Sequence, residues 1–255
     1  MEGTMNKTYK ILMTVLIATV AITAQISNNG LVAWFPFNGN YGDESDNKAT
    51  ITSYGAPKLI SDRNGTSNAA YELDGYTQGF KSLNAGKLPV GNQDFTITAW
   101  IIFKGGSIAR TLVSWGKDSV GLNSQISLHL KPISGNTYLA LTNGVDTVYT
   151  ECPTAVTSRW YFVAVKVSAG NATFYMDGVP VTPQKITFNV LSSGVLGLGL
   201  NMRNDNIRVD YFGGSFDDVT IYNRALSDAD ITHMKTTKPT RNMATSITSY
   251  APSRL

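Results

Sequence analysis

Apolar and polar side chains alternate with a period of two along much of the chain, and this pattern predicts β-strands with one buried face. In the segment 95–103 every second residue is apolar. The segment 160–167 carries apolar residues on both sides, with Trp160 on one side and Tyr161 on the other, so we expect a central strand that is buried on both faces. Shorter segments with strand character are 31–35, 69–73, 111–115, 126–130, 138–141, 147–149, 172–176 and 216–222.

Turn residues separate the predicted strands. Asp177-Gly178 is the dipeptide that best supplies the two positive φ angles of a type I′ hairpin turn. Gly135-Asn136 and Asn143-Gly144 interrupt the preceding segments in the same way. Strands that recur every ~8–12 residues with turns between them are typical of a sandwich or jelly roll. Because no Pro/Ser-rich linker divides residues 31–235, we expect one all-β domain.

One short helix is predicted near the C-terminus. Ser227 is placed as its N-cap, and Asp230 stands where the second member of a capping box belongs. We expect the helix to end near Lys235. The following residues, 237–255, are polar with little periodicity and are predicted to form a loosely ordered tail.

The first residues, 1–24, are predicted to be a signal peptide. Lys7 and Lys10 precede an apolar run from Ile11 to Ala24 that ends in small residues. This run is shorter than the ~20 residues that a membrane-spanning helix needs, so we expect no membrane span in the mature chain. An uncleaved membrane anchor is the alternative. The protein is therefore expected to be secreted or to lie at the cell surface.

Composition and charge narrow the classes of partner. The chain has 21 basic and 18 acidic residues, and a net charge of +3 without a basic stripe argues against a nucleic-acid partner. It contains only four glutamates but 12 tyrosines and 23 glycines, which favours strands and turns over long helices. Cys152 is the single cysteine, so no internal disulfide can form, and the sequence does not show what this thiol does.

Three motifs together suggest a family. They are Leu31-Val-Ala-Trp-Phe-Pro-Phe-Asn-Gly-Asn-Tyr-Gly-Asp43, Phe174-Tyr-Met-Asp-Gly-Val179 and Gly214-Ser-Phe-Asp-Asp-Val-Thr-Ile-Tyr-Asn-Arg-Ala-Leu-Ser-Asp228. With them the chain resembles the concanavalin A-like lectin/glucanase superfamily, and specifically its laminin-G-like domains.

The resemblance covers roughly residues 31–236 and implies a jelly-roll sandwich of two antiparallel sheets. With the short C-terminal helix predicted above, we expect the domain to comprise residues 25–236. It also implies an extracellular domain that binds glycans or proteins. The chain departs from the family pattern after Asp74-Gly75, where Tyr76-Thr-Gln-Gly-Phe80 replaces an acidic residue and an aromatic-apolar strand.

A structural calcium ion is the sharpest chemical hypothesis. The loop 38–47 concentrates carboxylates, amides and glycines, and Ca²⁺ takes ~6–8 oxygen ligands. If Val219 and Ile221 face the core, Asp217 shares their side of the strand and, once ionised, needs a cation or several hydrogen-bond donors there, whereas Asp218 points to the other side. The resemblance implies Asp43 and Asp217 as ligands. The alternative is that both carboxylates cap turns and accept hydrogen bonds from backbone amides.

The sequence gives little support to catalysis. A retaining glucanase needs two carboxylates ~5–5.5 Å apart, and the family places them in a Glu-x-Asp-x-x-Glu run. Here Glu72 and Asp74 match this run, but Thr77 replaces the second glutamate. His129 and His233 have no partner that would complete a zinc site or a catalytic dyad. We therefore predict that the protein is not an enzyme.

Aromatic residues in polar or glycine-rich segments mark the expected ligand edge, because their flat apolar faces can stack on a sugar ring. These residues are Tyr41, Tyr54, Tyr76 and Phe80. Packing against the rim of the sandwich is the alternative for each of them. The sequence thus predicts a calcium-stabilised module for carbohydrate binding or adhesion. A structural surface protein that binds other protein chains is the second hypothesis, and a glycoside hydrolase with an atypical site is the third.

Overall fold

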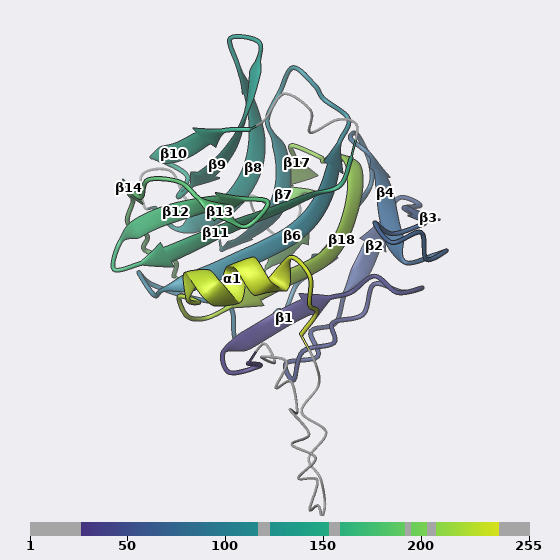
Figure 1. The fold of residues 1–255 in the computed structure, drawn as a ribbon, viewed down its shortest axis with the longest axis horizontal. Coiled ribbons are helices and arrows are strands. Elements are labelled where there is room, and N and C mark those ends of the chain that lie inside the picture. The colour runs from purple at the N-terminus through teal and green to yellow at the C-terminus, as the bar shows by residue number, and fades with distance from the viewer. Residues whose placement is uncertain (1–26, 117–122, 153–158, 192–194, 203–207, 240–255) are drawn as a thin grey trace, which may run out of the picture.

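Two antiparallel sheets pack face to face in the computed structural model, which describes residues 27–116, 123–152, 159–191, 195–202 and 208–239 (Figure 1). The larger sheet has the strand order β13-β12-β11-β6-β18-β4-β3, with β1 paired to β18 and β14 paired to β12. Its strands are β1 (Leu31–Phe35), β3 (Lys58–Ile60), β4 (Ala70–Asp74), β6 (Phe95–Phe103), β11 (Tyr161–Ser168), β12 (Asn171–Met176), β13 (Val179–Pro180), β14 (Gln184–Lys185) and β18 (Gly213–Tyr222).

The smaller sheet has the order β10-β9-β8-β7-β15-β5-β2 within the described residues. Its strands are β2 (Thr52–Tyr54), β5 (Gly79–Ser82), β7 (Arg110–Gly116), β8 (Gln125–Ile133), β9 (Asn136–Thr142), β10 (Thr147–Glu151) and β15 (Leu196–Leu198). A two-stranded ribbon pairs β16 (Asn201–Met202) with β17 (Arg208–Val209). The predicted jelly-roll sandwich of two antiparallel sheets is confirmed.

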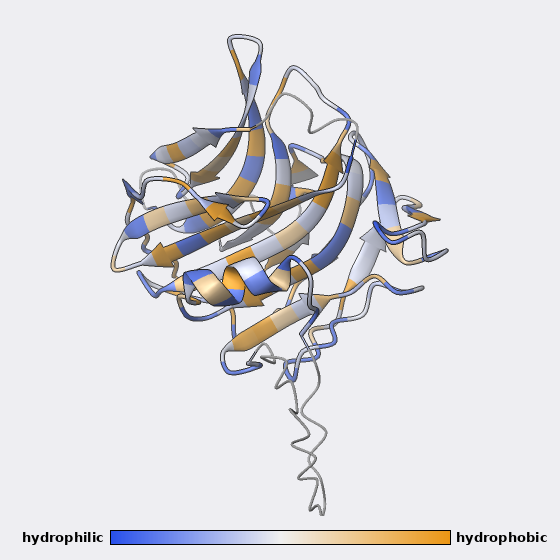
Figure 2. Cartoon of the chain, viewed as in Figure 1, coloured by the Kyte–Doolittle hydropathy of each residue, from blue (hydrophilic) through white to orange (hydrophobic). Residues whose placement is uncertain are grey.

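The main core fills the space between the sheets. Alternate residues of β6, from Phe95 to Phe103, all belong to this core, as the alternation in the sequence predicts. Figure 2 shows the same alternation of hydrophobic and hydrophilic positions along β8 of the other sheet. Cys152 also lies in the core, where burial raises the pKa of its thiol to about 12. This free cysteine is therefore a packing residue with almost no thiolate at neutral pH.

A second apolar cluster covers the outer face of the larger sheet. The helix α1 (Asp228–Met234) lies on this face, and its buried Ile231 and Met234 belong to the same apolar cluster as Phe162 of β11 (Figure 1). The helix explains why β11 is buried on both sides, as predicted. Its N-terminus has the predicted capping box, because Ser227 Oγ accepts a hydrogen bond from Asp230 N and Asp230 Oδ2 accepts one from Ser227 N.

The Asp177-Gly178 turn between β12 and β13 has the predicted geometry, with φ angles of 52° and 83°. After α1 the chain does not become loosely ordered at once. Lys238 forms an ion pair with the buried Asp218, 3.0 Å away, so the start of the expected tail is fixed to the sheet. Residues 240–255 and the predicted signal peptide lie outside the described residues. Within the described ranges, no helix is both long enough and apolar enough to span a membrane.

Candidate functional site

The most promising site lies on the outer face of the larger sheet, beside α1. Trp100 and Ile102 of β6 point to this face because the alternate residues of the strand face the core. Only 8% of Trp100 is exposed, and its ring contacts that of Phe162 with 5.6 Å between the centroids. Trp100 Nε1 is buried and has no hydrogen-bond acceptor among the described residues. This tryptophan forms the floor of a cleft.

Arg63 reaches over Trp100 from the loop between β3 and β4. Its guanidinium carbon lies 4.6 Å from the centroid of the Trp100 ring, which is a cation–π contact. Asp62 holds the loop in shape, because its Oδ1 accepts hydrogen bonds from the backbone amides of Asn64 and Thr66 at 2.9 and 2.8 Å. Burial alone raises the pKa of Asp62, but these amides and nearby Lys238 outweigh it and lower the pKa. The carboxylate therefore stays ionised.

A β-bulge in β18 places two carboxylates beneath Arg63. Asp217 pairs with Trp100 and Thr220 pairs with Thr98, so two residues of β18 lie opposite a single residue of β6. Asp218, the first of these two, has a φ angle of 45°. Arg63 Nη1 donates to Asp217 Oδ2 at 2.8 Å and to Asp218 Oδ2 at 2.7 Å.

Because of the bulge, Asp217 lies on the other side of the strand from the one predicted. The prediction assumed a regular strand in which Asp217 lies on the same side as Val219 and Ile221. Both Phe216 and Val219 belong to the main core, which is possible only because the bulge shifts the alternation between them. Asp217 therefore lies on the outer face with Trp100, and Asp218 does not point away from it but shares Arg63.

Asp217 and Asp218 share the same cation at close range. Asp217 is fully buried, and burial together with the negative charge of Asp218 raises its pKa to about 7, against the lowering effects of Lys238 and Arg63. Asp218 Oδ1 is buried without a hydrogen-bond partner in the described part of the chain. One guanidinium thus serves two carboxylates that repel each other.

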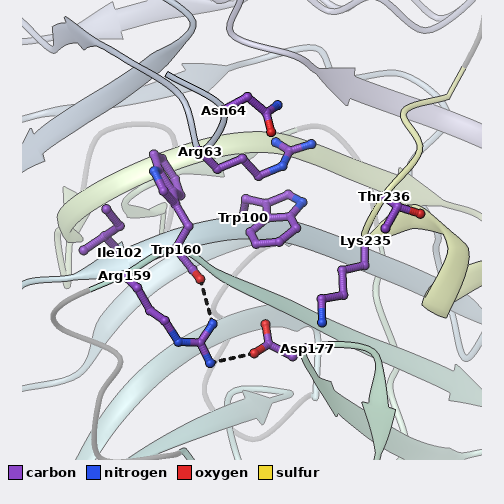
Figure 3. A pocket seen from close by; sticks show the side chains of 9 residues that line it. All are labelled: Arg63, Asn64, Trp100, Ile102, Arg159, Trp160, Asp177, Lys235 and Thr236. Atoms are coloured by element: carbon purple, nitrogen blue, oxygen red, sulfur yellow. Dashed lines mark hydrogen bonds and ion pairs between the residues drawn. The ribbon is translucent and has the colours of Figure 1, made fainter. Parts of the chain in front are cut away.

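Arg159, Trp160, Asp177, Lys235 and Thr236 complete the cleft. Figure 3 shows Trp160 and Ile102 on one side, Lys235 and Thr236 on the other, and Trp100 between them. Arg159 Nη2 donates to Asp177 Oδ2 at 2.8 Å, and Arg159 Nη1 donates to the Trp160 carbonyl at 3.1 Å. The type I′ turn brings Asp177 to this place. The cavity has a volume of about 700 Å³.

This arrangement is suited to binding. Trp160 is partly exposed and offers an apolar ring, while the guanidinium, ammonium, hydroxyl and carboxylate groups around it offer donors and acceptors. Among the described residues that line the cleft, there is no serine or cysteine to act as a nucleophile and no histidine to act as its base. A polar ligand with one flat apolar face matches these groups.

The residues predicted to bind calcium are engaged elsewhere. Asp43 Oδ1 accepts from the amides of Trp34 and Ser45 at 3.0 and 2.9 Å, and Asp43 Oδ2 accepts from the amide of Ala49 at 2.9 Å. Asp217 is paired with Arg63, as described above. In the described ranges no group of three or more His, Cys, Asp or Glu side chains is placed to hold a metal ion. As arranged here, Asp43 and Asp217 do not fit a shared calcium ion, which stays a prediction from the sequence.

The four aromatic residues of the predicted ligand edge have different environments. Phe80 is fully buried in the core on strand β5, so that prediction is wrong for this residue. Tyr41 packs against Phe80 with 5.3 Å between the ring centroids, which is the rim packing considered as the alternative. Tyr54 lies beside Lys81, whose Nζ is 5.2 Å from the ring centroid. Tyr76 is 73% exposed, and among the four it alone presents most of its surface to solvent.

The residues of the weak glucanase motif also have structural partners. Glu72 forms an ion pair with Lys104 at 2.9 Å. Asp74 Oδ1 accepts hydrogen bonds from the amides of Tyr76 and Thr77 at 2.8 and 2.9 Å and so caps the turn after β4. His129 is buried on β8, and burial lowers its pKa to about 4. Glu72 and Asp74 are therefore both engaged in structural contacts and do not form a free pair of carboxylates.

Two signals in the sequence could have indicated the cleft. Trp100 and Ile102 lie on the side of segment 95–103 that faces away from the core. Trp160 lies on the side of segment 160–167 that is opposite to Tyr161. Two tryptophans on one outer face need either a cover or a ligand. Arg63, Lys235 and Asp177 could not be assigned to this place, because loops and a helix end bring them there from distant parts of the chain.

Comparisons with known proteins agree with this fold. The family model described as the concanavalin A-like lectin/glucanases superfamily matches residues 74–232. A search of curated proteins gives no match.

Among solved structures, domain 4 of AbnA, an extracellular arabinanase of family GH43 from Geobacillus stearothermophilus in complex with arabinotriose, is similar with a TM-score of 0.61 and 22% identity. The similarity covers 80% of this chain and 98% of that domain.

The binding domain of botulinum neurotoxin DC is similar both in its complex with SialylT and in its complex with rat synaptotagmin II. The TM-scores are 0.59 and 0.60, with 16% and 17% identity. Each similarity covers 82% of this chain and 51% of the neurotoxin structure, so the chain spans about half of those domains.

Proposed function

The chain belongs to the concanavalin A-like lectin/glucanases superfamily, and from this premise we propose that it is a carbohydrate-binding module whose ligand lies in the cleft around Trp160 and Trp100. The single observation that carries the proposal is the partly exposed Trp160 in a cavity of about 700 Å³ that also holds charged and hydroxyl groups. Aromatic rings with polar groups around them supply both apolar contact and orientation for a ligand.

The similar structures support the class of ligand. The arabinanase domain was solved with arabinotriose and one neurotoxin binding domain with SialylT, so this architecture accommodates saccharides in other proteins. At identities of 22% and 16% these similarities establish the fold alone. The position of the site in this chain is therefore argued from its own side chains.

We expect binding without turnover. A retaining glycosidase needs two free carboxyl groups ~5–5.5 Å apart. In this chain Glu72 is paired with Lys104, Asp74 caps a turn and Asp177 is bound by Arg159. Export is part of the same proposal, because the segment 1–24 has the pattern of a signal peptide. The intact mass of secreted protein tests this, and a chain that retains residues 1–24 would refute it.

The experiment is a glycan array followed by calorimetric titration of the oligosaccharides that bind, with arabinotriose and a sialylated oligosaccharide included. We expect Trp160→Ala to weaken binding by about tenfold or more, because it removes the exposed ring of the cleft. Tyr76→Ala is the matched control: it removes an exposed aromatic ring outside the cleft and should leave affinity unchanged. Loss of binding in Tyr76→Ala with normal binding in Trp160→Ala would refute the site.

A further inference from the structure

We infer that the glycan bound in this cleft is acidic, and that its carboxylate or sulfate group lies near Lys235 and Arg159. The inference rests on the proposed function and specifies its class of ligand. The walls of the cleft carry three cationic side chains, Arg63, Arg159 and Lys235, and one carboxylate, Asp177. Arg63 is already compensated by the two carboxylates beneath it, so the remaining cations, Arg159 and Lys235, exceed Asp177 by one formal positive charge, 2 − 1 = 1.

Lys235 is the cation with the greatest freedom to bind an anion. It follows the last residue of α1, and Figure 3 shows its ammonium group directed into the cleft. In the part of the chain that the structure describes, its ammonium group has no ion-pair partner. A cation that faces a cleft without a counter-charge is a natural site for a ligand anion.

Arg159 has donors to spare. It is 54% exposed, and it uses one N–H for Asp177 and another for the Trp160 carbonyl. A guanidinium has five N–H donors, so Arg159 keeps further donors for a planar carboxylate or a sulfate, although its guanidinium carbon also lies 3.6 Å from the centroid of the Tyr161 ring. Asp177 is neutralised by this pair and is also held by the backbone amide of Phe162, 3.2 Å from its Oδ1.

The floor of the cleft contains a buried hydrogen-bond donor. Trp100 Nε1 has no acceptor among the described residues, and Figure 3 shows this nitrogen on the side of the cleft where Lys235 and Thr236 lie. Buried donors in proteins almost always have a partner. Because this nitrogen is closed off from solvent, we assign no direct ligand contact to it.

Arg63 contributes little to the binding of an anion, because two carboxylates already compensate its charge. Its Nη1 is occupied by Asp217 and Asp218, which lie beneath it and are not part of the cleft wall. Its side chain is only 11% exposed. We therefore assign the direct contacts with the anion to Lys235 and Arg159.

The test is a calorimetric comparison of three probes on the full mature chain: a neutral oligosaccharide, its uronic-acid counterpart and its sulfated counterpart. We expect at least one acidic probe to bind about tenfold more tightly than the neutral one, with an affinity that falls as salt rises. The two acidic probes show whether the carboxylate or the sulfate is preferred.

Lys235→Gln should weaken binding of the acidic probe by about tenfold, and it should weaken binding of the neutral probe much less. Lys185→Gln removes the same charge from an exposed position on β14 and should have no effect. Thermal melting of both variants checks that they are folded.

Equal binding of neutral and acidic probes, with no effect of Lys235→Gln, would overturn the acidic-ligand inference and leave the proposed function standing. If Lys235→Gln and Lys185→Gln lose equal affinity for the acidic probe, the attraction depends on the overall charge of the protein, and the acidic-ligand inference is also overturned. If none of the three probes nor any glycan of the array binds, or if Trp160→Ala has no effect on binding, the proposed function fails, and the inference fails with it.

Discussion

Arg63, Asp217 and Asp218 form the most unusual contact set in the described part of the molecule. One nitrogen of Arg63 donates to both carboxylates, while its guanidinium stacks on Trp100. Burial of ionised groups is costly unless every charge is compensated, and here a second cation, Lys238, also binds Asp218. The floor of the cleft is thus held in place by a charge cluster in which burial and the neighbouring carboxylate raise the pKa of Asp217.

The stability of the protein should depend on the protonation of Asp217. Its folded pKa of about 7 lies above the ordinary value of 3.8, so the folded state binds this proton more tightly than the unfolded state. The contribution is therefore fully present below about pH 4 and is lost as pH rises to about 7. Between pH 5 and 8 the loss is about 3 kcal/mol of unfolding free energy.

Asp217→Asn should remove the part of the pH dependence of stability that comes from protonation of Asp217. Because the pKa of buried His129 is lowered to about 4, His129 acts in the opposite direction, and its effect is lost as pH falls below about 6.5. The measurement is therefore the difference between wild type and Asp217→Asn in urea denaturation from pH 5 to pH 8. We expect the variant to gain stability relative to wild type as pH rises. A difference that is constant with pH would contradict the raised pKa.

Among the elements, α1 is the one that positions Lys235 and Thr236. The helix begins at a complete capping box, in which Ser227 Oγ lies 3.0 Å from Asp230 N. Ser227→Ala should reduce the free energy of unfolding by about 1 kcal/mol, because it leaves a first-turn amide without its partner. Ser227→Asp keeps an acceptor at the N-cap and should restore most of the loss. Equal losses in both variants by urea denaturation would contradict this role of the cap.

Periodicity and turn chemistry predicted the elements well, and a local irregularity explains where they failed. The hairpin at Asp177-Gly178 and the cap at Ser227 depend on a few neighbouring residues, so the sequence contains the information directly. The bulge in β18 depends on pairing with β6, about a hundred residues away in sequence, and it reversed the facing predicted for Asp217. Phe80 was misplaced because a short strand between glycine-rich turns resembles a loop.

Across the whole molecule, the outer face of the larger sheet is divided by the chain that leaves α1. Figure 1 shows this segment crossing from α1 toward β1. On one side lies the cleft of Trp100 and Trp160. On the other lies a cavity of about 480 Å³ lined by Trp34 and Lys238, among others. The two cavities make this face, rather than the rim of residues 41–80 expected from the sequence, the proposed ligand surface.

Chelation tests the calcium ion predicted from the sequence against the arrangement of charges in the structure. If Arg63 compensates Asp217 and backbone amides compensate Asp43, calcium chelator should leave the melting temperature unchanged. Arg63→Met should lower the free energy of unfolding by about 3 kcal/mol, because it leaves two buried carboxylates with less positive charge. If chelator lowers the melting temperature of the wild type but not that of Asp43→Ala, the result would instead establish the bridging calcium ion.

The central claim is that a glycan occupies the cleft between Trp160 and Lys235. The chain has four tryptophans, and each indole N–H gives its own signal in a ¹H–¹⁵N spectrum. Trp115 is an internal control, because its Nε1 donates to the Pro89 carbonyl inside the core at 2.9 Å. On titration with the tightest-binding oligosaccharide, the account predicts shifts of the Trp100 and Trp160 signals while that of Trp115 stays in place. Binding that moves the Trp34 signal alone, or none of the four, would contradict it.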